Sequence, residues 1–417
     1  MSRHPSDDSA RAALERLAAT HGLDVKGGTL RRTSSRFCLG VEHGDYNGTE
    51  LFGVGTDRFL WLASKPNDSG RIRLVSGNFE QDGVVEFAPG SPPAPGAREV
   101  VDSWARFPCG VDWVLNKSGV ETRRGMDVVV YGDIPGGGMS RSASLLINLT
   151  LAFYDANGVS LDRASVPDGM QIVDLTQRVE NDYIGSPCGK LDMAMIYFAR
   201  AGMGTHYRPQ ERTIDYVPLG PGAVDFRILS LDTGTVRPGL EKSTYAVRAR
   251  ECVEAVAFLQ RYAPLKQLGD VRERDQYEHL EPALRAHAPH LADRLAYIFG
   301  AQQRFPRMLA AWRRGDVAAV GAIFRRDGRE LRDLYSISGP ELETMCDIVR
   351  TVPGVYGERM LGGGDKGAAG ALVATDAVDA VRQAVATAYP RSRPDFAERH
   401  AVHALAVVDG IADLQPL

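Results

Sequence analysis

The strongest chemical signal in the sequence is a run of glycines followed by hydroxyl-bearing residues, Asp133-Ile-Pro-Gly-Gly-Gly-Met-Ser-Arg-Ser-Ala-Ser144. The run lies between Met126–Tyr131, whose β-branched residues predict a strand, and Ala143–Tyr154, whose apolar residues predict a helix. Such a loop can turn its backbone amides inward, and the helix N-terminus adds unpaired N–H groups and a positive dipole end. The loop suits a polyphosphate, although a flexible strand–helix connection would have the same composition. Hydrogen bonds or a metal ligand could come from the hydroxyls of Ser140, Ser142 and Ser144.

A second segment, Arg36-Phe-Cys-Leu-Gly-Val-Glu-His-Gly-Asp-Tyr-Asn-Gly48, gathers ionisable and amide side chains in a short strand-to-turn stretch. Clustered carboxylates accept hydrogen bonds from neighbouring hydroxyls, so the segment suits a sugar. Arg36 could hold a phosphoryl group or a nearby carboxylate. An exposed Asp-Tyr-Asn-Gly turn would account for the same residues, and the segment taken alone favours that interpretation.

Two further segments could complete a site. In Glu180–Asp192 one helix ends near a glycine and a proline, and another begins near Leu191 with Asp192 in its first turn. Asp192 could act on a sugar hydroxyl and Glu180 could bind Mg²⁺, or Asp192 could simply favour the start of a helix. Gly354–Val373 is a second glycine-rich turn that leads into a strand. It is either a tight hairpin or a loop that closes on phosphates and packs on the first.

The elements that must position these segments indicate an α+β fold, because strands precede helices twice along the chain. Strands are expected at Arg36–Val41, Leu51–Gly55, Phe59–Ala63, Arg71–Val75, Phe226–Leu231 and Gly370–Thr375. Helices are expected at Ala10–Thr20, Gly169–Asp182, Thr244–Arg261, Leu280–Gly300, Pro306–Arg313, Asp316–Leu334 and Asp376–Tyr389. Two prolines and two glycines near residues 218–224 predict a boundary between domains 1–218 and 219–417.

Composition narrows the class of protein. The chain has 417 residues, of which 44% are hydrophobic and 24% charged, as in a globular protein of two domains. A net charge of −4 favours neither nucleic acid nor an acidic membrane surface. The N-terminus is polar, and no apolar run approaches the roughly 20 residues of a transmembrane helix. The five cysteines are scattered and odd in number, which predicts free thiols in the cytoplasm.

Taken in order, the four segments resemble the signatures of the galactokinases, which are members of the GHMP kinase superfamily. Ser35–Gly48 is similar to Gly-Arg-Val-Asn-Leu-Ile-Gly-Glu-His-Thr-Asp-Tyr-Asn-Gly, and Gly138–Ala143 to Gly-Leu-Ser-Ser-Ser-Ala. Pro187–Met193 is similar to Pro-Cys-Gly-Ile-Met-Asp-Gln, and Glu358–Ala368 to Ser-Arg-Met-Thr-Gly-Gly-Gly-Phe-Gly-Gly-Cys. The resemblance runs from about residue 30 to 376, and four ordered motifs are far more specific than any one of them.

The resemblance implies a two-domain GHMP kinase fold, with an N-terminal domain like domain 2 of ribosomal protein S5 and a C-terminal ferredoxin-like α/β sandwich. It implies an ATP-dependent sugar 1-kinase in which Asp192 is the base and Arg36 the stabilising cation. Sugar contacts are implied for Glu42, His43, Asp45, Gly189 and Tyr245. ATP contacts are implied for Trp104, Gly136, Gly137, Gly138, Ser140, Arg141, Ser142, Ala143 and Ser144, and Mg²⁺ binding for Ser142 and Glu180. A cytoplasmic monomer or weak homo-oligomer is expected, with no nucleic-acid or membrane partner.

Several positions depart from the family pattern. Cys38 replaces asparagine, Gly44 replaces threonine and Met193 replaces glutamine, all beside residues that would hold the sugar. The substrate could therefore be galactose, a modified hexose or a cyclitol, and a non-catalytic regulator is a further alternative. In the glycine-rich segments Arg141 replaces serine, and Asp365-Lys366 replaces Phe-Gly. Arg141 and Lys366 could approach the β- and γ-phosphates from opposite sides, or one of them could pair with Asp365 on the surface.

Overall fold

A computed structural model describes residues 4–135, 137–236 and 243–417. Its larger sheet has eight strands, with β12-β1-β2-β5-β3-β4 side by side and a β6–β7 hairpin attached to β2. The neighbours are antiparallel except for the parallel pair β3–β5. The strand bounds are β1 (Thr29–Gly40), β2 (Leu51–Asn67), β3 (Ile72–Ser76), β4 (Val85–Phe87), β5 (Gly125–Gly132), β6 (Met203–Arg208), β7 (Thr213–Pro218) and β12 (Ile411–Leu414).

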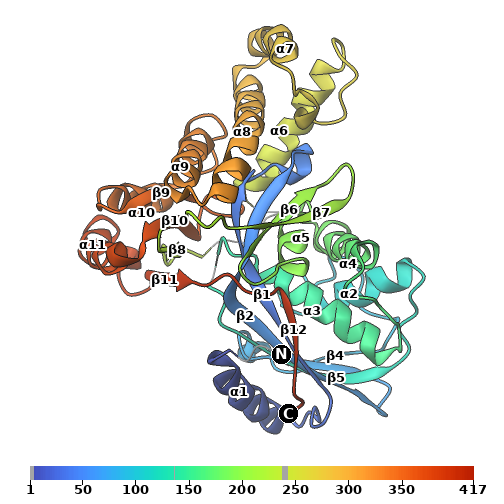
Figure 1. Cartoon of the computed structure of the whole chain (residues 1–417). Coiled ribbons are helices and arrows are strands. Elements are labelled where there is room, and N and C mark those ends of the chain that lie inside the picture. Colours follow the sequence, from blue (N-terminus) through green and yellow to red (C-terminus); the bar gives the residue numbers. More distant parts are fainter. Residues whose placement is uncertain (1–3, 136, 237–242) are drawn as a thin grey trace.

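Both faces of this sheet are covered, so residues on both sides of its central strands β1, β2 and β5 are mostly buried, polar ones included. Successive residues of β2 alternate between two cores. Phe59 and Trp61 pack with helix α1 (Ser6–His21), whereas Leu60 and Leu62 belong to the main core under the opposite helices. Figure 1 shows α1 on one side of the sheet and the other helices of this half on the other side. These helices are α2 (Arg106–Lys117), α3 (Arg141–Ala156), α4 (Val166–Arg178) and α5 (Leu191–Tyr197).

The smaller sheet is antiparallel, in the order β11-β8-β10-β9. Its strands are β8 (Phe226–Asp232), β9 (Val355–Met360), β10 (Ala368–Ala374) and β11 (Ala401–Leu405). The helices of this half are α6 (Thr244–Leu259), α7 (Arg274–His287), α8 (Pro289–Arg314), α9 (Val317–Asp333), α10 (Pro340–Arg350) and α11 (Val378–Ser392). The two sheets confirm the α+β class. After β11 the chain returns to the larger sheet as β12, so the C-terminus lies near α1 (Figure 1).

Several predicted elements need correction. The two strands predicted within residues 51–63 are one long strand, β2, with a register shift opposite Ser34 and Ser35. The helix predicted over Leu280–Gly300 is interrupted at Ala288, where Pro289 starts α8 and needs no hydrogen-bond donor. Pro306 does not begin a new helix but lies inside α8. Buried residues on both sides of it, including Phe305 and Met308, stabilise the continuous helix against the lost hydrogen bond.

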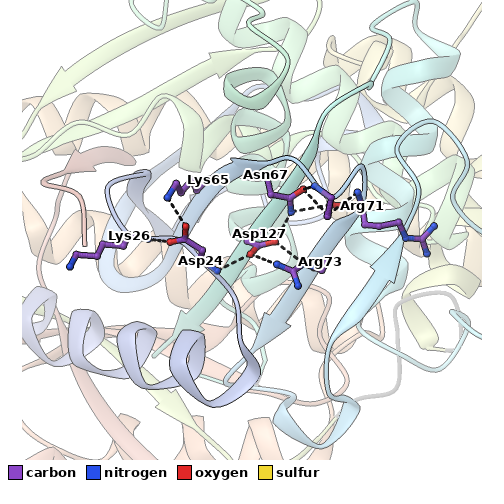
Figure 2. A network of polar contacts seen from close by, with 8 residues as sticks. Asp24, Lys26, Lys65, Asn67, Arg71, Arg73 and Asp127 are labelled. Atoms are coloured by element: carbon purple, nitrogen blue, oxygen red, sulfur yellow. Dashed lines mark hydrogen bonds and ion pairs between the residues drawn. The ribbon is translucent and has the colours of Figure 1, made fainter.

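A polar network ties the strands of the larger sheet together (Figure 2). Asp127 on β5 is fully buried and accepts hydrogen bonds from Arg73 on β3, at 2.9 and 2.5 Å, and from Asn67 on β2, at 2.6 Å. The backbone amide of Asp24, in the connection after α1, donates to the same carboxylate at 2.7 Å. One carboxylate therefore joins three strands and the connection from α1 to β1.

Candidate active site

The first glycine-rich loop connects β5 to the N-terminus of α3, as predicted, and Gly136 lies outside the described residues. Ser140 precedes α3 with a φ of 60°, and its hydroxyl is buried without a hydrogen-bond partner in the described part of the chain. The loop borders a cavity of about 220 Å³, whose lining includes Gly137, Gly138, Ser140, Arg141, Ser142, Glu180 and Asp192. An unpaired hydroxyl at a helix N-terminus in a cavity wall is suited to an anionic ligand.

The second glycine-rich segment is the turn between β9 and β10, and it packs directly on the first. A Cβ atom added to Gly137 would lie 2.7 Å from the Cα of Gly367, and one added to Gly362 would lie 3.0 Å from the Cα of Gly138. This approach of backbone to backbone explains why both segments are rich in glycine. Leu361 also donates to Ala368 across the turn at 3.0 Å. The segment is therefore both a hairpin and a loop packed on the first.

A second, small cavity of about 30 Å³ adjoins the first. It is lined by all five residues predicted to bind a sugar, Glu42, His43, Asp45, Gly189 and Tyr245, together with Cys188 and Leu191. Four further lining residues are common to both cavities, namely Arg36, Asp192, Gly362 and Gly363. Residues from four separate segments of the sequence thus form one continuous site.

An ion pair stands where the two cavities meet. The Nε and Nη2 atoms of Arg36 each lie 2.8 Å from Oδ1 of Asp192, and Nη1 of Arg36 donates to the carbonyl of Gly138 at 2.7 Å. Burial opposes the charge of Arg36, but the carboxylates of Asp192 and Glu42 outweigh it and raise the pKa of Arg36 above its ordinary value. Arg36 therefore stays cationic, and it links the carboxylate to the first glycine-rich loop.

The small cavity also contains carboxyl groups with raised pKa values. Burial and the nearby charge of Asp192 raise the pKa of Asp45 to about 7, although backbone amides, including that of Leu191 at 3.3 Å, donate to it. Near neutral pH Asp45 can therefore donate a hydrogen bond to a hydroxyl as well as accept one. Burial likewise raises the pKa of Glu42. A side chain on Gly189 would collide with Asp45, so only glycine fits beside this carboxyl.

Some predicted nucleotide-binding residues lie elsewhere. Ser144 is fully buried, and its hydroxyl forms a 2.8 Å hydrogen bond with the hydroxyl of Thr33 on β1. Ala143 is packed in the core. Arg141, Ser142 and Leu145 line the cavity. Helical periodicity explains this arrangement, because successive residues of the first turn of α3 point in different directions and only some face the cavity.

Aromatic residues missed by sequence analysis border the larger cavity. Trp104 was expected to border adenine, but its indole is buried in the core and is not part of the described lining. Phe79 and Phe107 line the cavity instead, together with Asn78 and Arg106. Of the two phenylalanines, only Phe107 lies near a residue predicted to contact the nucleotide, because it follows Trp104 by three positions.

Arg141 and Lys366, the two cations that depart from the family pattern in the glycine-rich segments, lie in different surroundings. Arg141 lines the larger cavity, and its guanidinium carbon lies 5.6 Å from the centre of the Phe79 ring. Burial lowers the pKa of Arg141 below its ordinary value. Lys366 is exposed and outside the described lining, and Asp365 accepts a hydrogen bond from Thr244 at 3.0 Å.

The donors predicted for Mg²⁺ lie in the wall of the larger cavity. Ser142 is in the first turn of α3, and the buried Glu180 is on a π-helical turn, Val179–Ile184, that replaces the end of the helix predicted to Asp182. Within the described residues no three His, Cys, Asp or Glu side chains cluster as a metal site. One carboxylate and one hydroxyl fit Mg²⁺ only if phosphate oxygens and water complete its shell.

Comparisons with known proteins agree with this geometry. Residues 109–200 match the family model described as GHMP kinases N terminal domain. The chain is 31% identical to a galactokinase of Exiguobacterium sibiricum, with 84% of this chain and 85% of the relative covered, and 31% identical to one of Streptococcus mutans, with 89% and 92% covered. Solved structures of other proteins share this fold.

Among these structures, the galactokinase of Lactococcus lactis complexed with galactose has a TM-score of 0.85 and 26% identity, covering 97% of this chain and 99% of its own. The mevalonate kinase of Methanococcus jannaschii, at 14% identity and a TM-score of 0.59, shares the fold. No helix in the described parts of the chain is long and apolar enough to cross a membrane. The chain belongs to the galactokinase family of GHMP kinases and is a kinase, a phosphotransferase with an alcohol group as acceptor.

Proposed function

We propose that the protein transfers the γ-phosphate of ATP to the anomeric hydroxyl of galactose or a closely related sugar. The observation that carries this proposal is the meeting of two cavities at the Arg36–Asp192 pair. One cavity has a glycine-rich helix N-terminus suited to phosphates, and the other has carboxyl, imidazole and phenol groups suited to hydroxyls. An acceptor hydroxyl and a terminal phosphate could thus face each other across the shared residues.

In this mechanism Asp192 accepts the proton of the anomeric hydroxyl as the oxygen attacks phosphorus. Arg36 orients the carboxylate of Asp192 and stabilises the charge that develops on the transferring phosphoryl group as ADP leaves. Phosphoryl transfer depends mainly on positioning and on charge stabilisation, so a fixed cation and a modest base suffice. The two 2.8 Å contacts between the side chains support such a fixed arrangement.

The sugar would be held by Glu42, His43, Asp45, Gly189 and Tyr245. Three positions that depart from the family pattern, Cys38, Gly44 and Met193, are absent from the described lining of the small cavity. Cys38 and Met193 are packed in the core, and a side chain on Gly44 would meet Thr49. These departures therefore support no change of sugar, and galactose is favoured over a cyclitol or modified hexose.

The nucleotide would occupy the larger cavity, with its phosphates at Gly137, Gly138, Ser140 and Ser142. The amides of the loop and the N-terminus of α3 would bind phosphate oxygens. Ser142 and Glu180 would hold Mg²⁺, which when bound neutralises charge on the phosphates. Phe79 and Phe107 offer the aromatic surface that the adenine base requires.

A steady-state assay with ATP and a panel of sugars tests the proposal. We expect turnover with galactose, release of ADP and formation of a sugar 1-phosphate, together with thermal stabilisation by galactose. Turnover of a cyclitol but not of galactose would overturn the choice of substrate. Stabilisation by galactose and ATP without any turnover would instead favour the regulator.

A further inference from the structure

Arg359, near the end of β9, is a buried arginine that reaches from the smaller sheet to the larger one. Arg359 is 1% exposed, and it does not belong to the described lining of either cavity. The Nη2 atom of Arg359 donates to Oε2 of Glu42 at 2.8 Å and to the carbonyl of Cys38 at 2.9 Å. Both acceptors belong to the segment Arg36–Gly48, some 320 positions earlier in the sequence. The contact therefore joins the two halves of the chain directly behind the site.

The position of this guanidinium is fixed from behind. Its central carbon lies 4.4 Å from the centre of the Phe324 ring on α9, and a side chain on Gly328 of the same helix would collide with the Arg359 side chain. The Nε and Nη1 atoms of Arg359 are buried without a hydrogen-bond partner among the described residues. The hydrogen bonds of this cation are thus concentrated on the segment that carries Glu42.

Glu42 in turn stands between two arginines. Its Oε2 atom is held by Arg359, while its Oε1 atom lies 3.9 Å from Nη2 of Arg36. The backbone amide of Gly362, in the second glycine-rich turn, also donates to this carboxylate. Arg36 meanwhile contacts Asp192 at 2.8 Å. A single cation, Arg36, therefore has two carboxylates within reach and is in close contact with only one of them.

We propose that Arg359 is a positioning residue, which keeps Glu42 from competing with Asp192 for Arg36. The proposal rests on the proposed function, in which the Arg36–Asp192 pair performs phosphoryl transfer. Without Arg359, the buried carboxylate of Glu42 would take Arg36 as its nearest cation, because a buried charge is stable only when paired. The guanidinium would then move away from Asp192 and from the transferring phosphoryl group.

This account predicts a rescue that a merely structural role does not. Arg359→Met should lower kcat by about 10- to 100-fold, because misplacement of a catalytic group by an ångström can cost on the order of 10²-fold. Glu42→Gln removes the competing charge. The double variant Glu42→Gln/Arg359→Met should therefore have a higher kcat than Arg359→Met alone, within about threefold of Glu42→Gln. Arg359→Lys, which retains a cation near Glu42, should lose less than Arg359→Met.

The full-length wild type and these four variants would be assayed with ATP and galactose, with kcat and both KM values measured and melting temperature recorded. Arg350→Met is a matched control, since Arg350 donates to the buried Glu358, the neighbour of Arg359 on β9, at 2.6 Å. It should lower stability and leave kcat unchanged. An inactive wild type would overturn the proposed function itself.

An active wild type in which the losses of the two single variants simply multiply would overturn only the role of Arg359. The same holds if Arg359→Met lowers the melting temperature with no change in kcat. Should Arg359→Met fail to fold, the charge-balanced double variant is compared with Glu42→Gln. A tenfold lower kcat in the double variant would then contradict the proposal.

Discussion

Arg36 is the residue on which the geometry of the site depends. It contacts the carboxylate of Asp192, lies near that of Glu42 and donates to the carbonyl of Gly138. The proposed base, the sugar pocket and the phosphate loop are thus connected through one buried guanidinium. Its planar fork suits this role better than the single ammonium of lysine would.

Asp192→Asn should keep the fold and galactose binding and lower kcat by about 10²–10⁴-fold, the usual contribution of a general base. Asparagine has the same size and can still accept from Arg36, but it is a far weaker proton acceptor. Turnover and thermal stabilisation by galactose would be measured on the same preparations. Asp182→Asn is the control, since Asp182 pairs with Arg178 on the surface. Turnover within a few-fold of wild type would mean that Asp192 only favours the start of α5.

Arg141→Ala should raise the KM for ATP by about tenfold, because a hydrogen bond from a charged group is worth on the order of 1.5–3 kcal/mol. Arg141 is a partly buried cation in the wall of the larger cavity, with its guanidinium carbon 5.6 Å from the centre of the Phe79 ring. Lys366→Ala, the matched control from the second glycine-rich turn, should have no effect because its side chain is exposed. Equal effects of the two variants would instead support a clamp formed by both residues.

Ser142→Ala and Glu180→Gln should raise the Mg²⁺ concentration needed for half-maximal activity and leave galactose binding unchanged. Both side chains line the larger cavity and supply the hard oxygen donors that Mg²⁺ prefers. The check is a Mg²⁺ titration at saturating ATP, with galactose binding followed by thermal shift. An unaltered titration together with lost galactose binding would contradict this assignment of metal donors.

At the scale of elements, contiguous motifs could be predicted and contacts between distant segments could not. The strand–loop–helix unit around Ser140 and the helix start at Leu191 follow from local residue patterns. The strand β12 has no such pattern, because its pairing with β1 is fixed by tertiary contact across nearly the whole chain. The link from Arg359 to Glu42 was missed for the same reason. Pro306 was wrongly expected to begin a helix, because packing within α8 outweighs the tendency of proline to interrupt a helix.

The network around Asp127 illustrates how elements remote from the chemistry stabilise the sheet (Figure 2). Asp127→Ala should lower the free energy of unfolding by about 3 kcal/mol, since it leaves Arg73 without its carboxylate and removes a buried acceptor. Denaturant unfolding would measure the loss. Lys65→Ala, which breaks the exposed pair with Asp24, should leave stability close to that of wild type. The KM values of both variants should match wild type, and a large change in either would show that the network reaches the site.

At the scale of the whole molecule, the site exists only because the two halves of the chain meet. The first glycine-rich loop follows a strand of the larger sheet, and the second joins two strands of the smaller sheet. Their backbones are in direct contact at Gly137 and Gly367. The C-terminal strand β12, by pairing with β1, adds a second connection between the halves. We therefore expect a small change at the loop contact to affect catalysis more than stability.

Gly367→Ala tests this expectation. Its φ of 99° is unfavourable for alanine, and the new Cβ would lie 2.9 Å from the backbone of Gly137, so the two loops must separate. Gly158→Ala is the matched control, because its φ is also positive, at 67°, but no atom lies within 4 Å of the new Cβ. Both variants should lose about 1 kcal/mol of stability from backbone strain. Only Gly367→Ala should also lower kcat/KM for ATP, by on the order of 10²-fold, because the phosphate loop is displaced relative to Arg36. Equal kcat/KM values for the two variants would show that contact between the loops is not needed for phosphoryl transfer.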